Sequence, residues 1–372
     1  MSERPIQRIS ILGVGLIGGS LGLSWKKYRP SLSVMGYDRP DILERALARG
    51  AIDETADQPE EAVTQADLVV VSVRLSAMPA LLELIAPHLP DGCVVTDVGS
   101  VKRPIVRHAE AVLPEGVTFV GGHPMAGSEQ GGIEHADSFL FENATYVLCP
   151  PAAGGDDRLR SDHPEFLELI VATGAHVLML DPDRHDRIAA AVSHLPQLLS
   201  VALVDYVALL HEEDEAFLRL AAGGFRDMTR IASSPYAIWR DILIANEGRV
   251  LDATAGFAAT FQRLRNRMIE ESLEDIEALF DRARSVRERI PRDTKGFLHP
   301  LADIYVFAED RPGVLHAITR VLLDVHLNIK DVELLKVREG TGGAFRLGFN
   351  DGAEADAAVE ALSTGGFTAY RL

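Results

Sequence analysis

The sequence predicts an α/β chain in three parts, and two observations lead to this prediction. From residue 8 to residue 180, apolar runs rich in Val, Ile and Leu alternate with helical patterns, which is typical of a parallel sheet covered by helices on both faces. From residue 187 to about residue 292 the pattern is helical throughout, and after residue 300 short strands and helices alternate again. We therefore expect a sheet domain, an all-α domain and a small mixed domain.

The sheet domain, residues 1–181, should contain seven strands joined by helices. The expected strands are 8–13, 32–37, 67–73, 92–97, 117–121, 145–149 and 175–180. The clearest helical stretches between them are 18–28, 40–50 and 77–88. Helices between successive strands are the connections that parallel strands require, so the strands should run parallel.

The helical domain, residues 182–293, begins with a helix that is apolar nearly all round, "RIAAAVSHLPQLLSVALVDYVALL" at 187–210. Such a helix must be buried, either inside a domain or between subunits. Residues 247–290 repeat apolar side chains at helical spacing, with many Arg and Glu on the other face. These patterns predict an all-α domain, and it resembles the helical dimerisation domains of small dehydrogenases at the level of the fold.

The last domain, residues 301–372, follows a linker, "PRDTKGFLHP" (291–300), that carries proline at each end. Its elements are expected at 303–308, 313–325, 328–337, 343–349, 353–362 and 367–371. Their order, β-α-β-β-α-β, is that of the ferredoxin-like motif.

The composition is that of a soluble globular protein of 372 residues, 47% hydrophobic and 25% charged. A formal net charge of −18 argues against nucleic acid as a partner, because phosphate binding needs a basic surface. No apolar run reaches the ~20 residues of a membrane helix and "MSERPIQR" is no secretory signal, so we expect no membrane span and a cytoplasmic location. An anionic substrate would need a few arginines to attract it locally.

A glycine-rich segment, "ISILGVGLIGGS" at 9–20, places Gly13, Gly15 and Gly18 in the pattern G-x-G-x-x-G. It follows an apolar strand and begins a helix, which is the context of a Rossmann-type dinucleotide site. Gly13 would form the tight turn, Gly15 would let the backbone approach a pyrophosphate, and Gly18 would let helix and strand pack closely. Leu16 and Ile17 would lie against the cofactor at the helix N-terminus.

The identity of the dinucleotide is predicted by the end of the second strand. Asp38 stands twenty residues after Gly18, where an acid meets the adenine ribose 2′-OH of NAD. A carboxylate there repels the 2′-phosphate of NADP, although Arg39 follows immediately and would partly offset the repulsion. We therefore expect NAD as the cofactor.

Two further glycine-bearing segments follow predicted strands: "TDVGSVK" (96–102) and "GGHPMAGSEQGG" (121–132). Ligands of open α/β sheets bind beyond the carboxyl ends of the strands, so both segments should project Ser100, Lys102 and His123 toward the cofactor. The glycines would let the backbone pass close to a ligand, and Pro124 would stiffen the turn.

Five motifs in order resemble the prephenate dehydrogenase family, over residues 6 to 292. They are "GVGLIGGSLG", "DVGSVK", "GGHPMAGSEQGG", "SHLPQLL" and "GGFRDMTRIASSPYAIWRDI". The resemblance implies NAD-dependent oxidative decarboxylation of prephenate to 4-hydroxyphenylpyruvate in tyrosine biosynthesis. Some members act instead on the amino counterpart, arogenate.

The resemblance places the catalytic base at His123, and the position after a strand independently puts this residue beside the nicotinamide. A neutral imidazole suits the role, because hydride loss requires acceptance of the hydroxyl proton. Ser100 would orient the same hydroxyl or the imidazole. Aromatisation drives the decarboxylation, and we expect no metal.

Four residues of the helical domain receive roles from the resemblance, each with a simpler alternative. His194 would bind or orient the substrate, or be an ordinary core histidine next to the helix-breaking Pro196. Arg230 would clamp a substrate carboxylate and Asp227 would orient His194, or the two would form a surface ion pair. Trp239 would bind substrate, or only pack the helical core.

The tail "EDRPGVLHAITRVLLDVHLNIKDVEL" resembles an ACT domain, an amino-acid-sensing module. The resemblance implies an effector, for which tyrosine is the natural candidate, although the tail could instead be purely structural. The expected effector residues are Asp310, Arg311, Pro312, Gly313, Val314 and Asn328.

The sequence therefore favours a feedback-regulated, homodimeric prephenate dehydrogenase with NAD. Three alternatives stay open. The first is arogenate (cyclohexadienyl) dehydrogenase, and the second is a non-catalytic sensor of nucleotide and amino acid, against which the set of Ser100, His123, His194 and Arg230 argues. The third is a β-hydroxyacid or imine-reducing dehydrogenase, which would place a catalytic lysine in the helical domain, whereas residues 187–245 contain no lysine.

Overall fold

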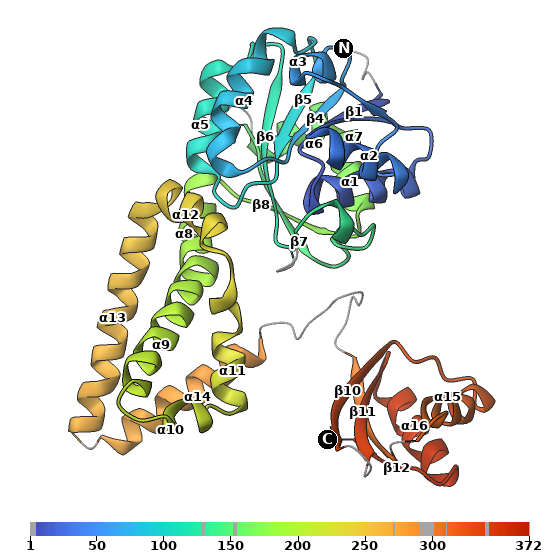
Figure 1. The fold of residues 1–372 in the computed structure, drawn as a ribbon, viewed down its shortest axis with the longest axis vertical. Helices are drawn as coiled ribbons and strands as arrows, with labels where there is room; N and C mark the ends of the chain where they lie inside the picture. The colour runs from blue at the N-terminus through green and yellow to red at the C-terminus, as the bar shows by residue number, and fades with distance from the viewer. Residues whose placement is uncertain are drawn as a thin grey trace. The chain divides into compact units, whose positions relative to one another are not determined.

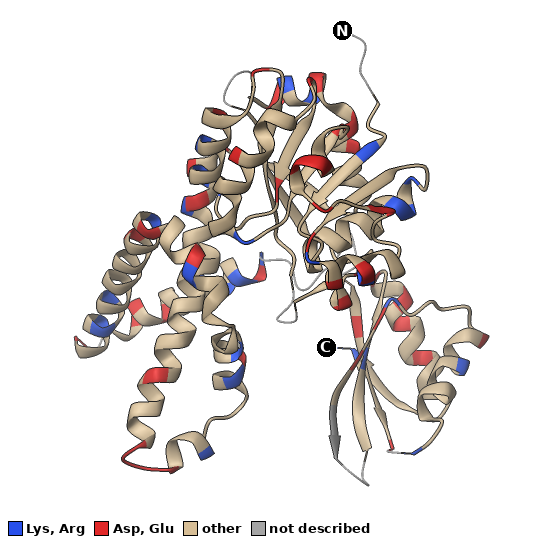
Figure 2. Cartoon of the chain, turned by 45° about the horizontal axis from the view of Figure 1, so that its top comes forward, with Lys and Arg blue, Asp and Glu red and all other residues tan. Residues whose placement is uncertain are grey.

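The chain forms two compact units, Met1–Asp281 and Arg282–Leu372, in the computed structural model (Figure 1). The structure describes residues 5–127, 131–151, 155–270, 272–289, 301–309, 311–338 and 342–371. Acidic and basic residues are interspersed over the helices of both units (Figure 2).

An eight-stranded sheet forms the first part of the first unit, in the order β3-β2-β1-β4-β5-β6-β7-β8. The strands are β1 (Arg8–Leu12), β2 (Ser33–Tyr37), β3 (Glu54–Thr55), β4 (Leu68–Val71), β5 (Val94–Asp97), β6 (Thr118–Pro124), β7 (Thr145–Cys149) and β8 (His176–Met179). The first six lie in the strand order of dinucleotide-binding folds, 3-2-1-4-5-6. The predicted Rossmann-type domain is thus confirmed.

The sheet differs from the predicted one in two places. β3 was not predicted because it has only two residues, both exposed, and so carries no apolar run. β7 pairs antiparallel with β6, whereas every other pair in the sheet is parallel. Within the described part of the connection between them, the only helical element is the three-residue turn η3 (Ile133–His135), too short for the crossover that a parallel return needs.

Helices cover both faces of this sheet, as the continuous apolar strands predict. They are α1 (Leu16–Tyr28), α2 (Pro40–Ala48), α3 (Pro59–Val63), η1 (Leu75–Ala77), α4 (Met78–Ile85), η2 (Ala86–His88), α5 (Arg103–Val112), α6 (Gly155–Asp162) and α7 (Pro164–Ala172). Strand β4 shows the arrangement: Leu68 and Val70 belong to the apolar core on one face, and Val69 and Val71 to the core on the other. The sheet is therefore a middle layer with both faces buried, so a ligand can approach it at the ends of its strands.

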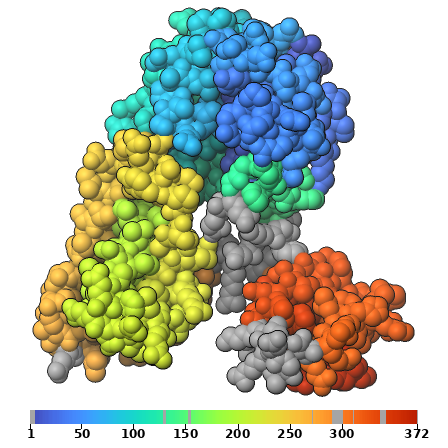
Figure 3. All heavy atoms as spheres, in the orientation of Figure 1, coloured from blue at the N-terminus to red at the C-terminus, as the bar shows by residue number. Residues whose placement is uncertain are grey.

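The rest of the first unit is helical. A continuous helical run, α8 (Pro182–Ala189), the π-helical turn η4 (Ala190–His194) and α9 (Leu195–His211), leaves the sheet. It is followed by α10 (Ala216–Arg219), α11 (Gly223–Thr229), η5 (Arg230–Ser233), α12 (Tyr236–Ala245), α13 (Glu247–Ile269) and α14 (Leu273–Glu288). The boundary between the two units, after Asp281, falls within α14. The sheet and the helices meet near α12, where Asp241 accepts a hydrogen bond from the Ser76 hydroxyl of η1 (Figure 3).

The apolar helix at 187–210 is not buried inside its own domain. Its described neighbours cover Gln197 and Ser200 on α9, while Val201, Tyr206 and Leu209 keep 45–60% of their surface exposed. By length and composition alone, Pro182–His211 is apolar enough to cross a membrane. The single chain therefore buries this helix only in part and leaves one apolar face of α9 exposed.

The second unit contains a four-stranded antiparallel sheet in the order β10-β11-β9-β12. Its elements are β9 (Ala302–Ala308), α15 (Val314–Asp324), β10 (Asp331–Arg338), β11 (Gly342–Phe349), α16 (Gly352–Thr364) and β12 (Thr368–Arg371). The core joins Ile304 and Leu347 of the sheet to Ile318 of α15 and Leu362 of α16. The predicted β-α-β-β-α-β order is confirmed.

Candidate active site

The glycine-rich turn between β1 and α1 has the geometry that each glycine was predicted to supply. Gly13 has φ +99°, and a Cβ there would lie 2.4 Å from the Ser72 carbonyl oxygen. A Cβ at Gly18 would lie 2.1 Å from the Gly13 carbonyl oxygen, so only glycine lets α1 pack this closely against the turn after β1. At Gly15, the residue before α1, nothing lies within 4 Å, which leaves room for a pyrophosphate at the helix N-terminus. Leu16 and Ile17 follow, half-buried, in the first turn.

Beyond this turn lies a cavity of about 630 Å³, lined by Gly13, Asp38 and Arg39 among others. Asp38 lines it at the end of β2, and its carboxylate accepts the backbone N–H of Val14 at 2.8 Å. Arg39 lines it too, but its side chain is exposed and its guanidinium lies 3.8 Å from the Asp41 carboxylate. The Asp38 carboxylate therefore lines this cavity, while the Arg39 guanidinium has the Asp41 carboxylate beside it.

His123 lies in strand β6 and not in a turn, so the predicted end of this strand at residue 121 is wrong. Gly122 and His123 pair with Leu148 and Val147 of β7. A Cβ at Gly122 would lie 2.3 Å from the Asp97 carbonyl oxygen, so glycine lets β6 continue past the end of β5. The run of glycines indicated a loop, but close backbone packing is what requires it here.

Lys102 does not project into the cofactor crevice, contrary to the prediction. Its side chain is fully buried, and its ammonium donates to the Asp97 carboxylate and to the Gly122 carbonyl. Asp97 also accepts the backbone N–H of Gly122 at 3.0 Å and of Gly99 at 2.8 Å. This buried ion pair fastens the end of β5 to the segment of β6 that carries His123.

Ser100, three residues after Asp97, is half-buried beside this pair. Among the described residues no hydrogen bond joins it to His123. Its proposed contact with the substrate hydroxyl thus stays a prediction.

The imidazole of His123 has a histidine as its neighbour. His123 Nδ1 lies 2.8 Å from Nε2 of His185, and His185 Nδ1 lies 2.7 Å from Oδ1 of Asp186. All three side chains are buried. The Asp186 carboxylate also accepts the backbone N–H groups of Lys102, at 2.7 Å, and Arg103, at 2.9 Å, where α5 begins. Sequence reasoning placed His185 only among the pocket-lining residues, without a partner, and did not single out Asp186; the adjacent "HD" of "PDRHDR" was the only available signal.

The electrostatics of this cluster favour a neutral imidazole at His123. Burial, then the ammonium of Lys102 and the rings of His185 and His194, lower the pKa of His123 well below its usual 6.5. At pH 7 the ring is therefore deprotonated and able to accept a proton.

His194 is buried in the same region, at the end of the π-helical turn and two residues before Pro196. π-turns of this kind are frequent at functional sites. Burial lowers the pKa of His194 to about 4, although the Asp186 carboxylate acts in the opposite direction. The ring of Trp239 meets it edge-on at 6.1 Å between centroids. The structure thus brings two predicted substrate residues together.

Asp227 is not the partner of His194. The His194 Nδ1 atom lies 3.3 Å from the side-chain amide of Asn246, which also donates to the Asp186 backbone carbonyl at 2.8 Å. Asp227 is exposed on α11, and within the part of the chain that the structure describes no hydrogen bond links it to His194. The described partner of the His194 ring is thus Asn246 and not the expected Asp227.

Arg230 is exposed at the beginning of η5. This turn is tied to α9, because the Gln197 side chain donates to the Ile231 carbonyl at 3.0 Å. The hydrogen bond holds the backbone next to Arg230 against α9, the helix that follows His194. The Arg230 side chain is exposed to solvent.

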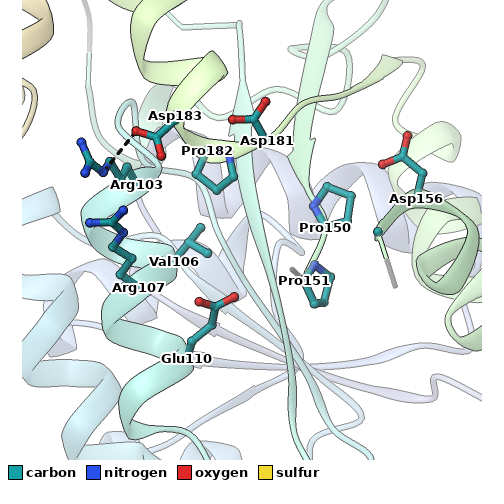
Figure 4. Close-up of a pocket in the computed structure, with 11 residues that line it drawn as sticks. Arg103, Val106, Arg107, Glu110, Pro150, Pro151, Asp156, Asp181, Pro182 and Asp183 are labelled. Atoms are coloured by element: carbon teal, nitrogen blue, oxygen red, sulfur yellow. Dashed lines mark ion pairs between the residues drawn. The ribbon is translucent and has the colours of Figure 1, made fainter. Parts of the chain in front are cut away.

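A second cavity, of about 340 Å³, lies between α5, the end of β7 and the start of α8 (Figure 4). None of the predicted site residues lines it. Its wall holds the ion pair between Arg103 and Asp183, at 3.2 Å, which joins α5 to α8. Among the described residues there is also no group of three His, Cys, Asp or Glu side chains able to hold a metal ion.

Comparison with known proteins identifies the family of this chain. The model of the prephenate dehydrogenase nucleotide-binding domain matches residues 21–178, and that of its dimerization domain matches residues 181–282. The chain belongs to the prephenate dehydrogenase family. It is 35% identical over 363 residues to the prephenate dehydrogenase of Bacillus subtilis (strain 168), which covers 95% of each chain.

Solved structures of the family share this fold. Prephenate dehydrogenase of Aquifex aeolicus, in complex with hydroxyphenyl propionate and NAD+, superposes with a TM-score of 0.71 and 30% identity. The match covers 78% of this chain and all of that one. Arogenate dehydrogenase of Synechocystis superposes with a TM-score of 0.67 and 27% identity, over 76% of this chain and all of that one. The chain is therefore an NAD-dependent oxidoreductase of the prephenate dehydrogenase family.

Proposed function

We propose that this family member is a cytoplasmic prephenate dehydrogenase, which oxidises prephenate with NAD and releases CO2 and 4-hydroxyphenylpyruvate. The observation that carries the proposal is His123, a buried neutral imidazole near the carboxyl end of β6, the end of the strands beyond which ligands of such sheets bind. The likeness to the Bacillus subtilis enzyme over nearly the whole chain supports prephenate as the substrate.

The residues of the site divide the reaction between them. Bound NAD would accept hydride from the ring carbon that bears the hydroxyl. His123 takes the hydroxyl proton on Nε2, because Nδ1 faces His185. Loss of CO2 then leaves its electron pair in the ring, and the phenolate that forms recovers the proton from His123. No net proton stays on the protein, and Ser100 would hold the hydroxyl during both transfers.

The assay that tests this function is the reduction of NAD and of NADP with prephenate and with arogenate. We expect the highest kcat/KM with prephenate and NAD, because Asp38 disfavours a 2′-phosphate. A higher kcat/KM with arogenate would mean that arogenate is the substrate, and the proposed reaction steps would stay the same. No reduction with either compound would reject the proposed function.

Arg230 is proposed as the carboxylate clamp that an acidic protein needs for an anionic substrate. Its replacement by alanine is expected to raise the KM for prephenate by about 10–100-fold with a smaller change in kcat, because a charge-assisted hydrogen bond is lost. Steady-state kinetics measure this. Arg226, exposed one turn earlier on α11, provides the matched control: Arg226→Ala should leave the KM unchanged. An unchanged KM in Arg230→Ala would exclude the clamp.

The helical domain is proposed to form the interface of a homodimer. Beside the apolar residues of α9, the side chains of Leu220, Tyr236 and Leu273 are more than 70% exposed in the single chain. A patch of this kind normally marks a protein interface. The match of residues 181–282 to a dimerization domain supports the same assignment.

Residues 301–372, which lie within the second unit, are proposed to be an ACT domain that binds an amino acid such as tyrosine. Gly313, in the left-handed conformation at φ +84°, is the residue just before helix α15, and Pro312 and Asn328 near the two ends of the helix are exposed. Arg311 lies 3.7 Å from the Glu309 carboxylate. Val314 is the first residue of the helix, and the predicted Asp310 lies outside the described residues.

Deleting residues 300–372 is expected to abolish the response to tyrosine and to leave the activity in place. The reason is that the candidate active site lies wholly in the first unit, and a whole Aquifex aeolicus chain is covered by 78% of this one. Initial rates with and without tyrosine measure the response in the full and truncated enzymes. Inhibition that persists in the truncated enzyme would place the effector at the active site.

A further inference from the structure

The hydrogen-bond chain behind His123 has a direction that its donors and acceptors determine. The Asp186 carboxylate receives two backbone N–H groups from the start of α5, and these can only donate. Its third neighbour, His185 Nδ1 at 2.7 Å, must then also be a donor, because an ionised carboxylate only accepts. The proton of a neutral His185 is therefore on Nδ1.

The direction of the hydrogen bond between His185 and His123 follows because a neutral imidazole carries only one N–H proton. With its proton on Nδ1, His185 presents a bare Nε2 to His123 Nδ1 at 2.8 Å. His123 must donate there, so its own proton is on Nδ1 and its lone pair on Nε2. The reverse direction would place a proton on His123 Nε2 and leave no nitrogen able to accept the substrate proton.

We propose that His185 and Asp186 are positioning residues that hold His123 in the tautomer with a bare Nε2, ready to accept the substrate proton. The proposal rests on the proposed function, in which His123 is the base. Neither residue would touch the substrate. They act as the buried carboxylate of a catalytic triad acts, by setting which ring nitrogen carries the proton.

The surroundings make this chain rigid. Asp186 is held from three places: the N–H groups at the start of α5, its own helix α8, and the Asn246 amide between α12 and α13, which donates to the Asp186 backbone carbonyl. The ion pair between Arg103 and Asp183 ties α5 to α8 beside it (Figure 4). The buried Lys102 ammonium disfavours a second positive charge on His123. A side chain with so many fixed contacts can impose a tautomer without rearranging.

The direct test is ¹⁵N NMR of the full chain labelled at its histidines, which distinguishes the two neutral tautomers. The His123 signals are assigned by their loss in His123→Gln. We expect Nδ1 protonated and Nε2 bare in the free enzyme at pH 7. A protonated Nε2 with a bare Nδ1 would overturn the proposal. This result is independent of turnover, so absence of activity with prephenate would reject the proposed function and leave the tautomer assignment standing.

The kinetic test uses His185→Phe, which keeps a ring but removes the acceptor. We expect kcat to fall about 10²-fold, with the KM values for prephenate and NAD changed less than about 3-fold. In His185→Gln the amide oxygen can accept the Nδ1–H of His123, so a large part of kcat should return. His163→Phe is the control. It removes a half-buried histidine that contacts the Thr118 hydroxyl, and we expect kcat to stay unchanged.

The outcomes of this series all bear on the proposal. A fall in kcat together with a His123 signal shifted to Nε2–H in His185→Phe supports it. Unchanged kcat in His185→Phe, or an equal loss in His185→Gln, contradicts it. If His185→Phe does not fold, as circular dichroism would reveal, the NMR measurement on the unmodified enzyme still decides.

Discussion

Replacing His123 with asparagine is expected to lower kcat by about 10²–10⁴-fold, because the group proposed to accept the hydroxyl proton is removed. Substrate and cofactor binding should change little, since the predicted clamp is Arg230 and the predicted cofactor contacts lie in the turn after β1. Asparagine is small enough for the position on β6 and keeps a hydrogen-bonding amide next to His185. Steady-state kinetics with NAD and prephenate measure both parameters.

A control separates this effect from general damage to the sheet domain. His108, partly buried on α5, contacts the Pro79 carbonyl and lies outside the proposed site. His108→Asn should retain full kcat. Retention of full kcat by His123→Asn would mean that another group accepts the proton, and both the proposed mechanism and the role of His185 would then be wrong.

The parts of the site that depend on local chain geometry could be predicted from sequence. Gly13, Gly15 and Gly18 are close in sequence, and the constraints on them come from the same short turn and from the strands beside it. Asp38 is also predictable, because a strand and a helix of ordinary length separate it from that turn. The second unit is predicted equally well, since each of its elements has its own periodic pattern.

The parts that depend on contacts distant in sequence could not be predicted. His185 lies 62 residues from His123, and Asp186 lies 84 residues from Lys102. No spacing rule relates such positions; only the fold brings the start of α8 to the ends of β5 and β6. Asn246 replaced the expected Asp227 as the partner of His194 for the same reason. A sequence indicates which residues can do chemistry, whereas their partners are set by packing.

The glycines before His123 show how a correct observation led to a wrong element. Glycine is usually unfavourable within strands, so the segment 121–132 was predicted as a turn. Gly121 and Gly122 are in fact needed inside β6, where a Cβ would meet Val106 and the backbone of Asp97. The neighbouring strand and helix impose this requirement, and they cannot be recognised from the segment itself.

Removing the buried cation beside these glycines should have the second large effect. Lys102→Met is expected to lower the free energy of unfolding of the first unit by about 3–5 kcal/mol, because it leaves the Asp97 carboxylate buried without its counter-charge. Both side chains are 0% exposed. Urea denaturation followed by tryptophan fluorescence measures the change, since both tryptophans of the chain, Trp25 and Trp239, lie in the first unit.

Lys26 provides the matched comparison, because it pairs with Asp53 at the surface with side chains 22% and 35% exposed. Lys26→Met should cost at most about 1 kcal/mol. The double variant Asp97→Asn with Lys102→Met should be more stable than Lys102→Met alone, because the unpaired charge is gone. If Lys102→Met costs no more than Lys26→Met, the pair does not hold β5 and β6 together. The position of His123 would then depend on its pairing with β7 and on the hydrogen bond to His185.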